Sequence, residues 1–227
     1  VNVADGAAFQ SVAHVTVGHL DGAGALVIGP FPKAAINAFT CDTDSGFSTN
    51  KTYTHLVNFP VEDGNVAVIN GVRVNNTGAW TRLGAAPANN WGNNTGTNDT
   101  GFGRLVYRFH HGSKDFGFTA SGLTAGKLYD LRIYFRDFAG TAARNATIVF
   151  SRNGAEIGRL RWNPDYDAEK GARRNACTAV GCRYVADSDG TVTARVYSDS
   201  GSDTCHVYGF SNELLGDAGD IAETVSL

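Results

Sequence analysis

Residues Gly122–Phe138, GLTAGKLYDLRIYFRDF, join a tight turn to a stretch with strict two-residue alternation. Successive side chains of a β-strand point to opposite faces, so residues two apart share a face. The set that would face a core is Tyr129, Leu131, Ile133 and Phe135. The set that would face outward is Asp130, Arg132, Tyr134 and Arg136. The stretch therefore predicts a β-sandwich strand with one buried face and one polar, arginine-lined face.

Three short turn signals support antiparallel pairing along the chain. They are Asn70-Gly71, Asn153-Gly154 and Asp189-Gly190, each between strand-like segments. Such pairs adopt the positive φ values that two-residue hairpin turns require. Strand-like runs, among them Arg104–Phe109, recur at the spacing of a sandwich, and no long helical pattern competes. We therefore predict an all-β fold, an antiparallel β-sandwich.

Composition limits the possible partners. The chain has 227 residues, of which 42% are hydrophobic, enough to bury the core of one domain. Its 19 Lys and Arg against 22 Asp and Glu give a net charge of -3, which is far from the basic excess of proteins that bind nucleic acid. Nucleic acid is therefore not an expected partner.

The residue pattern at the two ends of the chain differs from that of its middle. We expect a β-sandwich module over residues 37–215, preceded by a strand pair or arm at 1–36 and followed by a tail at 216–227. The first segment would be either an opening hairpin of the same sandwich or an arm that pairs with another copy. In the second case, Val3–Val17 would complete the sheet of a neighbouring molecule.

Several features indicate an exported protein, secreted or held at the cell surface. The chain begins at Val1, has no methionine, and has no apolar run of the roughly 20 residues that cross a bilayer. Its four cysteines suit disulfides of an oxidising compartment. The favoured pairs are Cys177 with Cys182 and Cys41 with Cys205. A metal site is the alternative, although the sequence has no C-x-x-C pair to support it.

Asp42 and Asp44 stand two residues apart, beside Gly46. This spacing can aim several oxygens at a hard cation, so Ca²⁺ is a candidate ligand there. The alternative is an Asp-rich turn whose carboxylates bond the local backbone.

Aromatic and arginine side chains near loops suggest a binding surface. Trp80, Trp91, Trp162 and Tyr166 lie in or beside loops, where an exposed ring can stack on a sugar. For Trp162, packing at the core or the sheet edge is the preferred interpretation. Arg132, Arg136 and Arg144 would offer donors to carboxylated or sulfated glycans, or would form surface pairs with Asp130 and Asp137. For Arg132 we prefer the surface pair.

Four phrases together resemble a module of secreted bacterial surface proteins. They are Asp44–Phe59 (DSGFSTNKTYTHLVNF), Ile69–Val74 (INGVRV), Gly122–Phe138 and His206–Leu214 (HVYGFSNEL). The likeness covers residues 38–214. It implies a galactose-binding-like jelly roll, a fold that many carbohydrate-binding modules use.

Three functions follow as hypotheses. The first is a non-catalytic, extracellular glycan-binding or adhesion module that uses Trp91, Tyr166, Trp80 and either Arg136 or Arg144. The second is a self-assembling subunit of a surface filament or matrix. The third is a polysaccharide lyase or hydrolase, for which the sequence offers neither a G-x-S-x-G elbow nor a recognisable frame of catalytic carboxylates.

Overall fold

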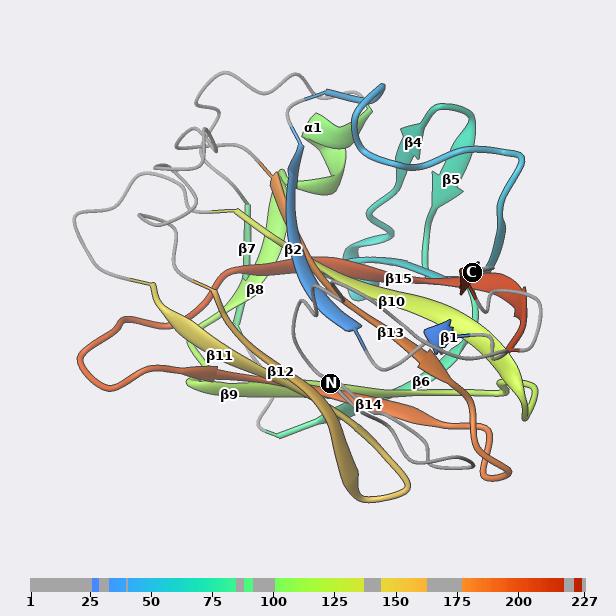
Figure 1. Cartoon of the computed structure of the whole chain (residues 1–227). Helices are drawn as coiled ribbons and strands as arrows, with labels where there is room; N and C mark the ends of the chain where they lie inside the picture. Colours follow the sequence, from blue (N-terminus) through green and yellow to red (C-terminus); the bar gives the residue numbers. More distant parts are fainter. Residues whose placement is uncertain are drawn as a thin grey trace.

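The computed structural model describes residues 26–28, 33–39, 41–84, 88–91, 101–136, 144–162, 177–218 and 223–225. Two antiparallel sheets form a sandwich (Figure 1), which confirms the all-β prediction. The larger, seven-stranded sheet contains β2 (Lys33–Phe39), β13 (Cys177–Val185), β10 (Lys127–Phe135), β15 (Val207–Asp217), β8 (Arg108–His111), β7 (Ala88–Trp91) and β3 (Thr52–Asn58). The five-stranded sheet runs β12 (Ala155–Trp162), β11 (Ala146–Arg152), β14 (Val192–Ser198), β9 (Asp115–Ser121) and β6 (Ala79–Leu83).

Four short strands and two helical turns complete the described part of the chain. β4 (Ala67–Ile69) and β5 (Val72–Val74) form a hairpin, and β1 (Leu26–Ile28) pairs with β16 (Glu223–Val225). α1 (Phe102–Leu105) precedes β8, and a 3₁₀ turn covers Val61–Asp63. Figure 1 shows α1 and the β4–β5 hairpin on the side of the seven-stranded sheet that faces away from the five-stranded sheet. We call this side the outer face.

The main core lies between the two sheets. The inward side chains of β10, among them Leu131, Ile133 and Phe135, are fully buried in it, as the alternation predicts. Phe210 of β15 stacks on Phe118 of β9 with a ring-centroid distance of 3.8 Å, which joins the two sheets at their centre. Trp162 packs on Phe135 at 5.1 Å and is 1% exposed, so its expected packing role is confirmed.

A second apolar cluster covers part of the outer face, which corrects the prediction of an open polar surface. Tyr134, predicted to face outward, is 1% exposed and packs against Phe39 and Phe47. Ile69 and Val74 of the β4–β5 hairpin and Leu105 of α1 belong to the same cluster. The alternation along β10 correctly separates its two faces, but it carries no information on distant segments that pack over one of them.

Two local predictions fail for identifiable reasons. Arg104–Phe109 was expected to be a strand, but α1 takes its first two residues and β8 begins only at Arg108. At the start of α1, the Asp42 carboxylate accepts a hydrogen bond from the backbone N–H of Phe102 at 2.7 Å. Asp189-Gly190 was expected to close a hairpin. It instead connects β13 to β14, which lie in different sheets. The other two turn signals are confirmed, since Asn70 and Asn153 have φ values of 49° and 47° in the β4–β5 and β11–β12 hairpins.

The seven-stranded sheet extends past both predicted boundaries of the β-sandwich module. β2 begins at Lys33, inside the segment expected to be a strand pair or an arm, and pairs with β13. β15 runs to Asp217, two residues beyond the expected end of the module. The proposed exchange strand Val3–Val17 lies outside the described residues. Among the helices that the structure describes, none has the length and apolar character needed to cross a membrane.

The cysteine prediction is wrong. Cys177 and Cys182 lie on the same strand, β13, and five residues of extended chain separate them by about 16 Å, far beyond the span of a disulfide. Cys41, Cys182 and Cys205 are free thiols. Cys41 is exposed beside the Thr43 hydroxyl, whereas Cys205 is buried beside the Ser198 hydroxyl. The cysteine count therefore no longer supports an oxidising compartment.

Alkylation should separate these thiols. Burial raises the pKa of Cys182 to about 12 and that of Cys205 to about 11, so neither offers an accessible thiolate at neutral pH. We expect iodoacetamide to modify Cys41 in the native protein and to reach Cys182 and Cys205 only after unfolding. Peptide mass spectrometry before and after denaturation would check this, and native modification of Cys182 would contradict it.

Candidate functional site

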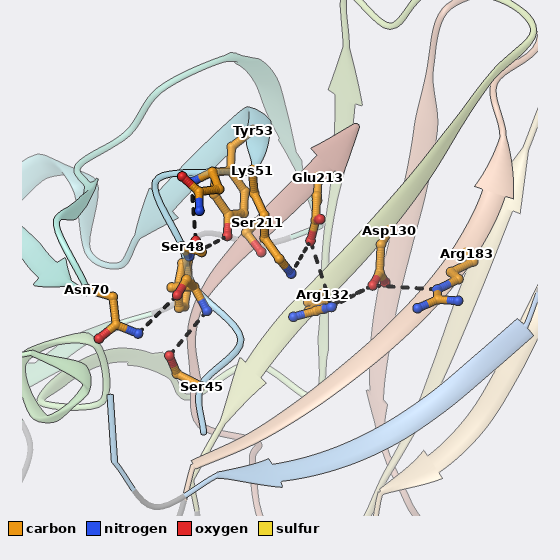
Figure 2. A network of polar contacts seen from close by, with 12 residues as sticks. Ser45, Ser48, Lys51, Tyr53, Asn70, Asp130, Arg132, Arg183, Ser211 and Glu213 are labelled. Carbon is orange, nitrogen blue, oxygen red and sulfur yellow. Dashed lines mark hydrogen bonds and ion pairs between the residues drawn. The ribbon is translucent and has the colours of Figure 1, made fainter. Parts of the chain in front are cut away.

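Strand register brings charged side chains together on the outer face of the seven-stranded sheet. Asp130 of β10 stands opposite Arg183 of β13 on one side and Glu213 of β15 on the other. Arg132, two residues further along β10, shares this face. Lys51 reaches the group from the loop before β3, as Figure 2 shows. We call these five residues the Arg132 network.

The network is held by paired charges around one guanidinium. Arg132 donates from Nε and Nη2 to Asp130 Oδ2, at 3.1 and 2.7 Å. Its Nη2 also lies 3.9 Å from Glu213 Oε2, which accepts a hydrogen bond from Lys51 Nζ at 2.9 Å. Arg183 Nε lies 3.8 Å from Asp130 Oδ2. The two carboxylates therefore serve as anchors, and the three cations surround them.

Exposure differs sharply between the anions and the cations. The side chains of Asp130 and Glu213 are each 9% exposed, whereas those of Arg132, Lys51 and Arg183 are 21%, 31% and 53% exposed. Within the part of the chain that the structure describes, Nη1 of Arg132 and both Nη atoms of Arg183 make no hydrogen bond. The network thus holds partly exposed cationic side chains, with N–H groups left over for further hydrogen bonds, at positions that buried carboxylates fix.

Electrostatics keep this surface cationic. Burial alone would lower the pKa of Arg132, but the adjacent Asp130 carboxylate outweighs burial and the pKa is raised. Burial also raises the pKa of Tyr53, which borders the network and accepts a hydrogen bond from the backbone N–H of Ser48. Three cationic and two anionic side chains leave one net positive charge on the network at neutral pH.

The residues predicted to bind a ligand do not join this network. Arg136 is fully buried and donates to the carbonyl of Val106, which corrects its assignment to a ligand surface. Arg144 donates to the carbonyl of Thr204 and pairs with Asp203, with its side chain 12% exposed. Trp80 packs edge-on against Phe59 and Phe210 on the inter-sheet core. Only the backbone of Trp91, at the end of β7, falls within the described residues, and Tyr166 lies outside them.

The predicted calcium ligands bond to the backbone. Asp42 Oδ1 accepts from the N–H of Phe102, and Asp44 Oδ1 accepts from the N–H of Cys41 at 2.9 Å. Among the described residues, no group of three or more His, Cys, Asp or Glu side chains is arranged to hold a metal ion. These bonds agree with the alternative of an Asp-rich turn, and calcium binding stays a prediction.

Sequence reasoning identified two of the five residues of the network and missed the other three. The pair between Arg132 and Asp130 is confirmed, because residues two apart on a strand share a face. Lys51, Arg183 and Glu213 carry no signal of their own, since each reaches the site from a segment far away in the sequence. The phrases containing Lys51 and Glu213 were noted only for their family resemblance.

No known family model and no curated protein matches the sequence. Similar solved structures include a family 35 carbohydrate-binding module from an environmental isolate, with 17% identity over 62% of this chain and 94% of that chain, and a TM-score of 0.36. A second is the CBM22-1 and GH10 modules of Clostridium thermocellum endo-1,4-β-D-xylanase 10B with xylohexaose. It has 14% identity over 78% of this chain and 30% of that chain, and a TM-score of 0.41.

A third similar structure is TmCBM61 in complex with β-1,4-galactotriose. It has 14% identity over 59% of this chain and 86% of that chain, and a TM-score of 0.35. Each of the three is, in whole or in part, a carbohydrate-binding module.

Proposed function

We propose that this chain is a non-catalytic, extracellular glycan-binding β-sandwich whose ligand contacts the Arg132 network. One observation carries the proposal: the side chains of Arg132 and Arg183 stay 21% and 53% exposed while Asp130 and Glu213 hold them in place. A guanidinium on a flexible surface chain loses side-chain entropy when it binds a ligand. The paired guanidiniums here are already ordered, so part of that cost is met before binding.

The chemistry of the network suits sugars. Ring hydroxyls accept hydrogen bonds from guanidinium and ammonium groups, and a sugar carboxylate can accept two parallel bonds from one arginine. The carboxylates of Asp130 and Glu213 can accept hydrogen bonds from sugar hydroxyls at the rim of the site. One net positive charge favours a neutral or acidic polysaccharide over a basic one.

Binding is preferred to hydrolysis because of how the two carboxylates are placed. Asp130 and Glu213 stand on neighbouring strands and approach one guanidinium, at 2.7 and 3.9 Å from its Nη2. Glycoside hydrolysis requires one protonated acid and one ionised partner, so the two environments must differ. Here both carboxylates face cations, an arrangement that suits two anchors better than an acid and a base.

Affinity electrophoresis would test the proposal. Native gels containing neutral xylan, polygalacturonate or chitosan present neutral, acidic and basic chains, and we expect one of the first two to retard the protein. Arg132→Ala removes charged hydrogen bonds, so affinity should fall roughly 10- to 100-fold. The matched control is Arg195→Ala, since Arg195 also pairs with a carboxylate, Asp115, but on the five-stranded sheet. Its retardation should equal that of the wild type.

Two outcomes would count against glycan binding at this surface. One is the absence of retardation by any of the three polysaccharides. The other is equal retardation of the wild type and Arg132→Ala. Release of reducing sugar from xylan or polygalacturonate, lost on Glu213→Gln, would instead indicate an enzyme.

A further inference from the structure

Asn70, at the tip of the β4–β5 hairpin, ties that hairpin to the loop that approaches the Arg132 network. Its Nδ2 donates two hydrogen bonds, to the carbonyl oxygens of Asp42 at 2.6 Å and Phe47 at 3.0 Å. Figure 2 shows Asn70 beside this loop, on the side away from Arg183. The amide therefore fixes two points of residues 41–51, which we call the 41–51 loop.

The segment between those two points turns tightly. Ser45 Oγ donates to the Asp42 carbonyl at 2.6 Å and accepts from the N–H of Phe47 at 3.3 Å. The Phe47 ring is buried against Tyr53 and Tyr134, with ring centroids 5.8 and 5.6 Å away. The 41–51 loop thus has an apolar anchor in the second core and a polar anchor in Asn70.

Gly46 lies between the two anchored carbonyls and borders the central guanidinium. A Cβ at this position would come within 2.9 Å of Arg132 Nη1, so the backbone of the loop forms a wall against this side chain. Gly46 also has a φ of 76°, which side chains rarely adopt. Displacing the loop toward the network would therefore move the guanidinium, and displacing it away would release one side of it.

We propose that Asn70 is a positioning residue of the glycan site, acting through the 41–51 loop on Arg132. The inference rests on the proposed function, because positioning has a purpose only where Arg132 binds a ligand. Asn70 does not belong to the Arg132 network. Its two N–H groups hold the carbonyls on either side of Gly46, and Gly46 sets the room available to Nη1.

Asn70→Asp is a nearly isosteric test of this role. The aspartate keeps the size of the side chain and tolerates the left-handed backbone, but its oxygens would face the two carbonyls without a proton to share. Asn153→Asp is the matched control. Asn153 has a φ of 47°, is also followed by glycine in a hairpin turn, and makes no side-chain hydrogen bond among the described residues.

Two readouts separate positioning from general destabilisation. The first is the Arg132 Nε–H resonance of ¹⁵N-labelled protein, identified by its loss in Arg132→Lys. The second is retardation on whichever of xylan and polygalacturonate retards the wild type. We expect Asn70→Asp to shift the Arg132 resonance and to weaken retardation roughly tenfold, at temperatures where the variant is fully folded. Asn153→Asp should change neither.

A second variant keeps the test possible if Asn70→Asp does not fold. Asn70→Gly keeps the positive φ and deletes the amide, and it should shift the same resonance. An unchanged Arg132 resonance in the folded Asn70 variants would overturn the inference, as would unchanged retardation. If the wild type is not retarded by any polysaccharide, the proposed function fails, and the resonance still reports whether Asn70 positions Arg132.

Discussion

Phe210→Ala is expected to lower the free energy of unfolding by about 3–5 kcal/mol, the range for truncating a fully buried phenylalanine. Phe210 is fully buried on β15 and stacks on Phe118 at 3.8 Å across the gap between the sheets. Trp80 and Phe59 also contact its ring, at centroid distances of 5.7 and 6.1 Å. Because aromatic rings surround it on several sides, the cavity cannot close by a small movement of one neighbour.

Urea unfolding followed by tryptophan fluorescence would measure this loss. Val68→Ala is the control, because Val68 is 49% exposed on the β4–β5 hairpin and should change stability by no more than about 0.5 kcal/mol. A loss below about 1 kcal/mol for Phe210→Ala, with an unchanged urea dependence, would mean that the two sheets do not meet at this stack.

The sequence predicted what depends on local pattern. Alternation along β10 assigned Leu131, Ile133 and Phe135 to the core, where they are fully buried. The turns at Asn70 and Asn153 were also predicted, because few residues adopt positive φ without strain. These features depend on residues within a few positions of each other, and such spacing is visible in a single chain.

The second core could not be predicted in the same way. Alternation says that Tyr134 and Arg136 point away from the inter-sheet core, but not that α1 and the β4–β5 hairpin pack over that side. Their burial depends on contacts between segments far apart in the chain. The expected arginine surface was therefore half right: Arg132 stays partly exposed, whereas Arg136 is enclosed.

In the candidate site too, the local pair was predicted and the contacts between distant segments were not. Spacing predicted that Asp130 and Arg132 pair, since they share a strand face. Arg183 and Glu213 join the site because β13 and β15 pair with β10 in a particular register. Sequence periodicity does not specify which strands become neighbours, so these two residues could not be predicted. The disulfide error has the same origin, because Cys177 and Cys182 look close in sequence until β13 extends through both.

Acid is expected to destabilise the protein through His206, with a loss of roughly 2 kcal/mol between about pH 6.5 and about pH 4.5. His206 is 5% exposed, and the centroid of its ring lies 4.2 Å from that of the Phe109 ring. Burial lowers its pKa to about 3, with smaller contributions in the same direction from Arg144 and His111 and an opposing one from Asp203. In the unfolded chain, His206 therefore binds a proton near pH 6.5, whereas in the folded chain it stays neutral until a much lower pH. The free energy of unfolding consequently falls as the pH drops below about 6.5.

Urea unfolding at several pH values, for the wild type and His206→Gln, would isolate this contribution. The variant should be less stable at pH 7 but should lose less stability on acidification. Some slope should remain, because burial also lowers the pKa of His55, whose Nε2 lies 2.9 Å from the carbonyl oxygen of Ala79. Equal slopes for the two proteins would mean that His206 is protonated in the folded state, and that the packing against Phe109 opens in acid.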